Sequence, residues 1–81
     1  MVHKLKIHPQ FFDAVANDIK PFEIRKNDRN FKVGDAVLLQ EFDGETYTTR
    51  ATQKVITYVL DDPQYCLCGY VILGLKGCDN G

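Results

Sequence analysis

Two cations and one carboxylate, Lys20, Glu23 and Arg25, stand within a short stretch of the sequence. In a strand, Glu23 and Arg25 point to the same face, because side chains alternate between the two faces. If Phe22 and Ile24 face the core, both charged side chains lie on the opposite face. Lys20 comes from the end of the helix expected before them. We therefore expect the three charged side chains to converge on one cleft between helix and sheet.

These three side chains suit an anionic or polar ligand. Arg25 can bind a carboxylate or a phosphate through two parallel hydrogen bonds, while Lys20 acts as a point charge. Glu23 can hold Arg25 in place, or accept hydrogen bonds from the exocyclic amine of a base. Alternatively, these residues have no role in binding. Glu23 and Arg25 would then form a surface ion pair that contributes less than about 1 kcal/mol to stability, and the nearby lysines would be solvated.

Charge is segregated along the chain, although 10 Lys and Arg nearly balance 11 Asp and Glu among the 81 residues. Residues 20–32 hold five basic residues against two acidic ones, whereas residues 33–62 hold two against six. Such a molecule can bind an anion at one face. Lys26 and Arg29 belong to the basic segment and join the candidates for phosphate contacts. The net charge of −1 excludes a uniformly basic, histone-like protein.

The elements that must position these side chains follow from periodicity. Residues 3–7 alternate between core-facing and basic side chains, which predicts a short strand. Pro9 suits the first turn of a helix, and Pro21 ends that helix. The apolar residues that share one face of this helix are Phe12, Val15, Ala16 and Ile19.

The rest of the chain reads as β structure. Strands are expected around residues 22–25, 36–42, 47–60 and 70–73, and Asp43-Gly44 begins a hairpin turn. In the strand at residues 36–42, Val37, Leu38 and Leu39 are expected to be buried. The order predicts one mixed α/β, mainly β domain over residues 1–81. Its economical form is a small curled sheet or β-barrel of about five strands with one N-terminal helix. The core is expected over residues 3–76, with residues 77–81 frayed.

A family resemblance rests on the central block. Lys20, Glu23 and Arg25 match the K-x-x-E-x-R part of the G-x-K-x-x-E-x-R signature of ASCH domains, which belong to the PUA-like superfamily. Residues 22–35, followed by the strands at 56–60 and 69–73, look like the DUF3850 subgroup of these domains. Asp18 stands where the signature has Gly.

The resemblance implies a small PUA-like β-barrel whose signature residues line a cleft beside the helix. ASCH domains are associated with RNA binding, and DUF3850 proteins are frequent in phages and bacterial mobile elements. One ASCH relative is an amidohydrolase acting on an acetylated cytidine. Its catalytic Lys matches Lys20, its catalytic Thr falls where this chain has Glu23, and its catalytic Glu has no clear equivalent.

The first functional hypothesis is a module that binds RNA or a nucleotide, with DNA as a further ligand. Lys20, Arg25, Lys26 and Arg29 would contact phosphates, and Glu23 would read a base edge. Aromatic residues that could stack on a base are Tyr47, Tyr58, Tyr65 and Phe31, although Phe31 and Tyr58 fit core packing better.

Two alternatives stay open. In the first alternative, the chain is a small amidohydrolase that acts on a modified nucleoside. Lys20 and Glu23 would then be the catalytic residues, and Thr48, Thr49 or Thr57 would supply the hydroxyl. Otherwise it is a protein-interaction module of a phage or mobile element. The sequence does not decide whether there is catalysis, nor the oligomeric state.

Three cysteines, Cys66, Cys68 and Cys78, are an odd number, which indicates free thiols in a reducing compartment. Their spacing does not suit zinc, and no cofactor is expected. The N-terminal residues lack the apolar stretch of a signal peptide, and no apolar run is long enough to span a membrane. The expected compartment is the cytoplasm.

Overall fold

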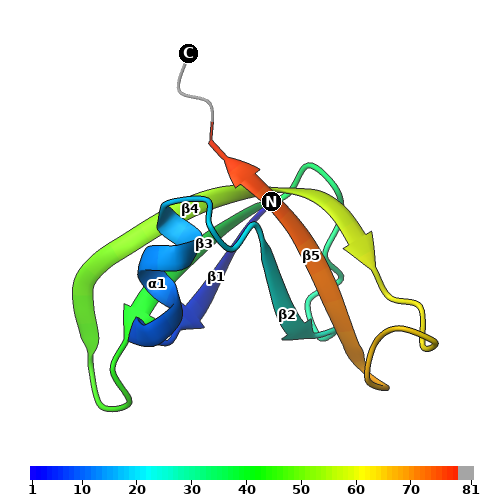
Figure 1. Cartoon of the computed structure of the whole chain (residues 1–81), viewed down its shortest axis with the longest axis horizontal. Coiled ribbons are helices and arrows are strands. Elements are labelled where there is room, and N and C mark those ends of the chain that lie inside the picture. The colour runs from blue at the N-terminus through cyan, green and yellow to red at the C-terminus, as the bar shows by residue number, and fades with distance from the viewer. Residues whose placement is uncertain (79–81) are drawn as a thin grey trace.

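A five-stranded sheet, curled into a half-barrel, and one short helix make up the computed structural model, which describes residues 1–78 (Figure 1). The strand order is β1-β3-β4-β5-β2, with β1 and β3 parallel and the other neighbours antiparallel. The predicted mainly β fold is confirmed. The elements are β1 (Val2–Ile7), α1 (Pro9–Ala16), β2 (Phe22–Lys26), β3 (Ala36–Phe42), β4 (Tyr47–Leu60) and β5 (Tyr70–Gly77).

Strand β4 curls the sheet because it serves both halves of it. Its first part pairs with β3 and its second part with β5. A bulge at Thr57 adds one residue to β4 opposite Gly74, and bulges bend a strand and increase its twist. A Cβ on Gly74 would lie 2.9 Å from the Thr57 hydroxyl, so only glycine fits there without a shift. The sheet therefore bends over, and β1 and β2 become two edges that diverge beneath β4 (Figure 1).

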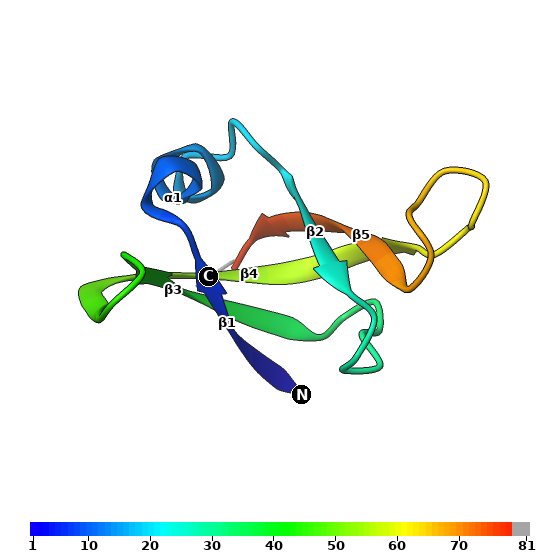
Figure 2. The ribbon, with the colours of Figure 1, turned by 90° about the horizontal axis from the view of Figure 1, so that it is seen from below.

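The core fills the concave side of this half-barrel. Helix α1 lies on the same side of the β3–β4 layer as β2 (Figure 2), and it contributes Phe12 and Val15 to the core. In β3, Val37 and Leu39 are fully buried, whereas Leu38 is only half-buried. The buried apolar residues are Leu5, Ile7, Phe12, Val15, Phe31, Val37, Leu39, Ile56, Val71, Leu73 and Leu75.

Strand β2 turns its charged face, and not its apolar face, toward the core. Phe22 and Ile24 are 39% and 56% exposed, whereas Glu23 is 5% exposed. The expectation that the two apolar residues face the core is therefore wrong. The alternation itself is correct, so Glu23 and Arg25 still share one face, and that face is the concave one.

The register with β5 explains this inversion. Glu23 lies opposite Leu73 and Arg25 lies opposite Val71, and both partners are fully buried in the core. Directly opposed residues share one face of a sheet. Strand β5 is apolar on both faces, so the sequence alone could not tell which side of β2 faces inward.

Helix α1 is shorter than its apolar pattern predicts. It ends at Ala16, and Ile19 is 77% exposed instead of packed on the core. The N–H of Asp18 donates to Val15 O (3.1 Å) and that of Ile19 to Ala14 O (2.8 Å), which is a Schellman ending. Asp18 has φ +59°, the left-handed conformation that glycine adopts without strain. Within residues 1–78 there is no helix of the length and apolarity needed to cross a membrane.

Ion pairs hold this short helix on the sheet. Arg50 Nη1 lies 2.8 Å from Asp13 Oδ1, and the buried Lys54 Nζ lies 2.7 Å from Asp18 Oδ1. Arg50 also donates to the buried carboxylate of Glu41. Eight residues are too few for a helix to be stable alone, so these links and the two buried apolar residues keep α1 in place.

The predicted fraying of residues 77–81 concerns a segment that is only partly described, and it stays a prediction. Gly77 still pairs with Lys54 at the end of β5, and Cys78 is half-buried. Residues 79–81 lie outside the described residues.

Replacing Asp18 tests the left-handed ending of α1. Asp18→Gly and Asp18→Ala both remove the carboxylate that pairs with Lys54, but only alanine is strained at φ +59°. We expect Asp18→Ala to lower the free energy of unfolding by about 1 kcal/mol more than Asp18→Gly does. Urea unfolding followed by circular dichroism measures both, and equal losses would contradict the assigned backbone conformation.

Several carboxylates make the fold sensitive to acid, among them Asp35 and Glu41. The hydrogen bond from His3 holds the pKa of Asp35 below its usual value, and those from Arg50 and then Thr48 do the same for the pKa of Glu41. A carboxyl whose pKa is lower in the folded chain stabilises the fold above its unfolded pKa. That stabilisation is lost as the pH falls through the lower, folded pKa.

We therefore expect the free energy of unfolding to decline once the pH drops below the ordinary carboxyl pKa of about 4. Asp35→Asn should make this decline shallower, because one of the responsible groups no longer titrates. The exposed Asp61, changed to Asn, is the matched control and should leave the decline as it is. Urea unfolding at a series of pH values measures the slope, and identical slopes for Asp35→Asn and the parent chain would refute this assignment.

Candidate functional site

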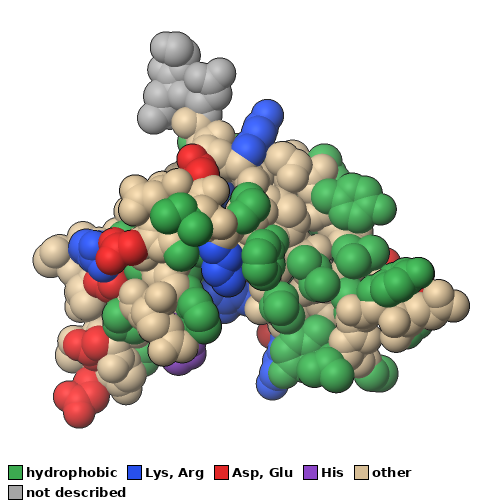
Figure 3. Space-filling view, viewed as in Figure 1, with side chains coloured by type: hydrophobic (Ala, Val, Ile, Leu, Met, Phe, Trp, Pro, Cys, Tyr) green, Lys and Arg blue, Asp and Glu red, His purple; other side chains and the backbone are tan. Residues whose placement is uncertain are grey.

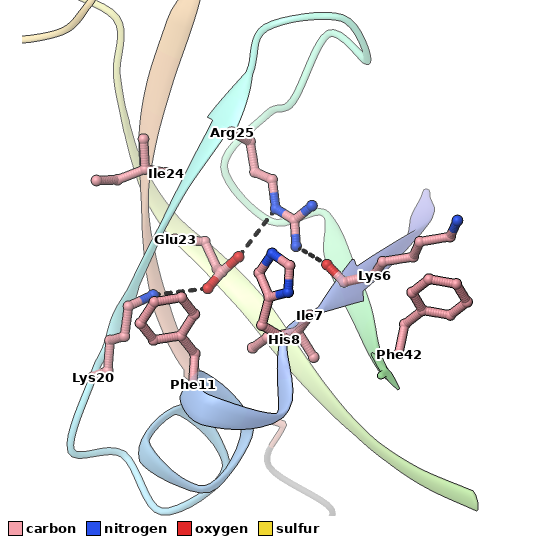
Figure 4. A pocket seen from close by; sticks show the side chains of 9 residues that line it. All are labelled: Lys6, Ile7, His8, Phe11, Lys20, Glu23, Ile24, Arg25 and Phe42. Carbon is pink, nitrogen blue, oxygen red and sulfur yellow. Dashed lines mark hydrogen bonds and ion pairs between the residues drawn. The ribbon is translucent and has the colours of Figure 1, made fainter. Parts of the chain in front are cut away.

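A cleft of about 520 Å³ opens between the two edge strands, beside the start of α1. Figure 3 shows Lys and Arg side chains in the hollow between the two halves of the molecule, with hydrophobic side chains on both sides. The volume lies within the range typical of small-molecule sites. The residues that line it are Lys6, Ile7, His8, Phe11, Lys20, Glu23, Ile24, Arg25 and Phe42 (Figure 4).

The carboxylate of Glu23 lies at the centre of the polar part of the cleft (Figure 4). Its Oε1 accepts a hydrogen bond from Lys20 Nζ at 2.8 Å, and its Oε2 accepts one from Arg25 Nε at 3.0 Å. Arg25 Nη2 also donates to the backbone carbonyl of Lys6. We call Lys20, Glu23 and Arg25 the charged cluster. It joins edge strand β2 to edge strand β1 and to the segment that follows α1.

The chain between α1 and β2 brings Lys20 to this cluster. After the left-handed Asp18 the chain turns, and Lys20 Nζ donates to Phe22 O at 3.0 Å as well as to Glu23. The same ammonium lies 4.8 Å from the centre of the Phe22 ring and 5.3 Å from that of Phe11. Of its three N–H donors, two are engaged within the chain, which leaves one for a ligand.

The walls of the cleft are apolar and aromatic. Ile7 from β1, Phe11 from α1 and Phe42 from the end of β3 line it together with His8, the residue that caps α1. Ile24 lies on the other face of β2 and points away from Glu23 (Figure 4). The site thus combines flat apolar surfaces with a cluster of hydrogen-bonding charges.

Sequence reasoning missed Lys6, His8, Phe11 and Phe42. One signal was present for Phe11, since it precedes Phe12 and two consecutive residues of a helix cannot face the same way. Phe11 is 39% exposed and lines the cleft, next to the buried Phe12. Phe42 reaches the site only through the pairing of β1 with β3, which no local pattern reveals.

A second hollow of about 290 Å³ adjoins the cleft, and we call it the basic groove. It shares Lys6 and Arg25 with the cleft and contains the predicted site residues Lys26 and Arg29. The structure thus brings Lys20, Glu23 and Arg25 together in the cleft and places the other two next door. The residues of the basic groove are Lys4, Leu5, Lys6, Arg25, Lys26, Asp28, Arg29, Phe31 and Tyr47.

The four predicted stacking residues lie in different places. Tyr47 lines the basic groove and is 52% exposed. Phe31 is buried and packs edge-on against His3, with ring centres 4.7 Å apart, as favoured for a core residue. The core packing favoured for Tyr58 is wrong, because this side chain is 63% exposed. Tyr65 is exposed in the β4–β5 connection and lines neither hollow.

The groups suggested for hydrolysis are dispersed. Thr48 donates to the Glu41 carboxylate at 2.7 Å, away from the cleft, and neither Thr49 nor Thr57 lines it. No hydroxyl or thiol occurs among the nine lining residues. Across residues 1–78, His, Cys, Asp and Glu form no group of three or more that could hold a metal ion. Cys66 and Cys68 are free thiols of the β4–β5 connection.

Comparison with known proteins gives one family and one phage relative. The family model described as "Domain of unknown function (DUF3850)" matches residues 2–75. A curated protein of Escherichia phage P2, described as an uncharacterized 12.9 kDa protein in the GpA 3′ region, is 38% identical over 72 residues. That alignment covers 89% of this chain but 65% of the phage protein, so the chain spans about two thirds of that relative's length.

Glu23→Gln tests the charged cluster. The substitution keeps the shape of the side chain but leaves Lys20 and Arg25 side by side without their counter-charge. We expect a loss of about 2 kcal/mol in the free energy of unfolding. Adding Lys20→Met to Glu23→Gln should recover part of that loss, because it removes one of the two uncompensated cations. Glu45→Gln in the exposed hairpin is the control, and a Glu23→Gln variant as stable as this control would show that the cluster contributes nothing.

Proposed function

The chain belongs to the DUF3850 family, and we propose that it is a module that binds RNA or a nucleotide through its cleft. The observation that carries this proposal is the meeting of flat apolar walls with the charged cluster in a single hollow. A nucleobase has the same two parts, a flat apolar face and a polar edge. The resemblance of Lys20, Glu23 and Arg25 to the ASCH signature supports the same ligand class and a place in the PUA-like superfamily.

The geometry suggests how a base would be held. Phe11 and Phe42 place aromatic rings in the walls of the cleft, where a base can pack against them beside the Lys6 and Lys20 ammonium groups, and part of Ile7 completes the apolar lining. Each oxygen of Glu23 retains a lone pair that can accept a hydrogen bond from an exocyclic amine. Arg25 Nη1 donates to no group among the described residues and can donate to a carbonyl or phosphate oxygen.

Phosphates belong at the rim of the cleft. Lys26 and Arg29 lie beside Arg25 in the adjoining basic groove, and neither forms an ion pair within residues 1–78. A phosphate attached to a base in the cleft would reach these cations. Binding by a few phosphate contacts depends on salt, because counterions are released.

Amidohydrolysis is the less supported alternative. Lys20 is ion-paired with Glu23 at 2.8 Å, and a paired ammonium has no lone pair with which to attack a carbonyl. The hydroxyl of the related enzyme is replaced here by the carboxylate of Glu23. Both features favour binding over turnover.

Protein interaction is the second candidate, since one observation favours it. Phe22, Ile24 and Tyr58 are all exposed, and β-sheet registers place them on the convex face of the half-barrel. A ligand of this face would leave the cleft undisturbed, so the two functions are separable by experiment.

Chemical-shift titration of the ¹⁵N-labelled chain with nucleosides, nucleotides and short RNA tests the proposal. We expect the amides of Phe11, Glu23 and Arg25 to shift. Arg25→Lys should weaken nucleotide binding about tenfold, because a lysine lacks the planar fork that donates to Glu23 and to the Lys6 carbonyl while Nη1 stays directed at a ligand. Lys76→Gln is the control and should bind as the parent chain does.

Three other outcomes would contradict binding at the cleft. Shifts confined to Phe22 and Tyr58 would assign function to the convex face. The absence of any shift would remove nucleotides from consideration. Conversion of an acylated cytidine to product would reinstate the hydrolase.

A further inference from the structure

Positive charge is concentrated in the cleft and the basic groove. Six of the chain's ten Lys and Arg residues line these two hollows, against two of its eleven Asp and Glu residues. The chain as a whole carries a net charge of −1, so this concentration is local. Placing like charges close together costs electrostatic energy in the free chain. A bound anion between these cations would offset that cost.

The basic groove has cations on both sides. Edge strand β1 supplies Lys4 and Lys6, and the end of β2 with the following turn supplies Lys26 and Arg29. Apart from Asp28, every charged residue lining the groove is positive. None of these four cations forms an ion pair within residues 1–78. The two edges of the half-barrel therefore face each other across the groove with uncompensated charge.

The groove and the cleft form one continuous track. Lys6 and Arg25 line both hollows, and Arg25 donates to the carbonyl of Lys6 at the boundary between them. Aromatic rings hold Lys6 there, since its Nζ lies 4.3 Å from the centre of the Phe42 ring and 5.8 Å from that of Tyr47. A ligand that fills the cleft and continues into the groove must pass these two cations.

Tyr47 gives the groove a surface for a second base. Its ring packs edge-on against Phe42, with centres 5.1 Å apart, and half of the residue is exposed. Stacking on such a ring tolerates any base. The groove thus repeats, next to the cleft, the combination of an aromatic ring and cations.

We infer that the basic groove binds the sugar-phosphate backbone of a single-stranded nucleic acid, which runs from the cleft past Lys6 and Arg25 toward Lys4, Lys26 and Arg29. This inference rests on the proposed function of the cleft. The strand is single because a base that enters the cleft must leave its stack. Tyr47 stacks on the neighbouring base. An acidic peptide would match the charge but would leave the aromatic surfaces unused.

Salt dependence measures the number of phosphate contacts. For the 81-residue chain and a five-nucleotide strand, four contacts give a slope of log K against log salt near −3, at about −0.7 per contact. Lys4→Gln removes one contact, so the slope should become about −2 while binding of a mononucleotide stays unchanged. Tyr47→Leu should weaken oligonucleotide binding about tenfold. Lys76→Gln removes the same charge outside the groove and should change neither quantity.

The same experiment compares several ligands: RNA and DNA strands of one sequence, a duplex, a mononucleotide and polyglutamate. Their affinities are measured by fluorescence anisotropy and by competition. Tighter binding of either strand than of the mononucleotide and the duplex supports the groove. Equal affinities for RNA and DNA assign the contacts to phosphates, and preference for RNA adds the 2′-hydroxyl.

Failure of this inference is distinguishable from failure of the proposed function. The inference about the groove is contradicted if an oligonucleotide binds no more tightly than the mononucleotide and Lys4→Gln leaves the salt slope unchanged. That result leaves the proposed binding of a base in the cleft untouched. Polyglutamate that competes as well as the strand also overturns the inference about the groove. Oligonucleotide binding that needs Lys4 but leaves the amides of Phe11 and Glu23 unshifted supports binding in the groove and contradicts base binding in the cleft.

Discussion

A carboxylate inside a curled sheet must be neutralised, and Glu23 is neutralised by cations that come from two directions. Lys20 arrives from the turn after α1, and Arg25 comes from the same strand. The cost of burying one charge is met only when its partners keep close geometry. The edge strands are therefore joined by the Arg25 side chain and the Lys6 carbonyl, while a cleft remains beside them. The charged cluster around Glu23 thus accounts both for how the two edges of the half-barrel are held and for the position of the candidate site.

The same principle fixes α1. The buried polar residues are His3, Glu23, Glu41 and Lys54, and every buried side-chain polar atom among the described residues has a hydrogen-bond partner. Asp18, just after the short helix, is the partner of Lys54, and Lys20 behind it is a partner of Glu23. Asp13 within α1 pairs with Arg50, which in turn donates to Glu41. Because α1 supplies Phe11 to the cleft, these links also hold one wall of the site. A wall that is already in place lowers the entropic cost of binding.

Much of this arrangement could be predicted from local patterns. Period-two alternation identified β1 and β2, Asp43-Gly44 marked the hairpin, and the spacing of Glu23 and Arg25 put both on one face. The inward face of β2 could not be predicted, because β5 is apolar on both faces and the register decides. The end of α1 was missed because Asp18 adopts a glycine-like conformation. Residues that enter the site through long-range pairing, as Phe42 does, leave no local signal.

The central claim is that a base enters the cleft beside the charged cluster. Intermolecular nuclear Overhauser effects between a ¹³C-labelled chain and a short unlabelled RNA test this most directly. The account predicts contacts from base protons to the Ile7 methyl groups and the Phe11 ring. Contacts to Phe22 and Tyr58 on the convex face, with none to Ile7 or Phe11, would contradict it.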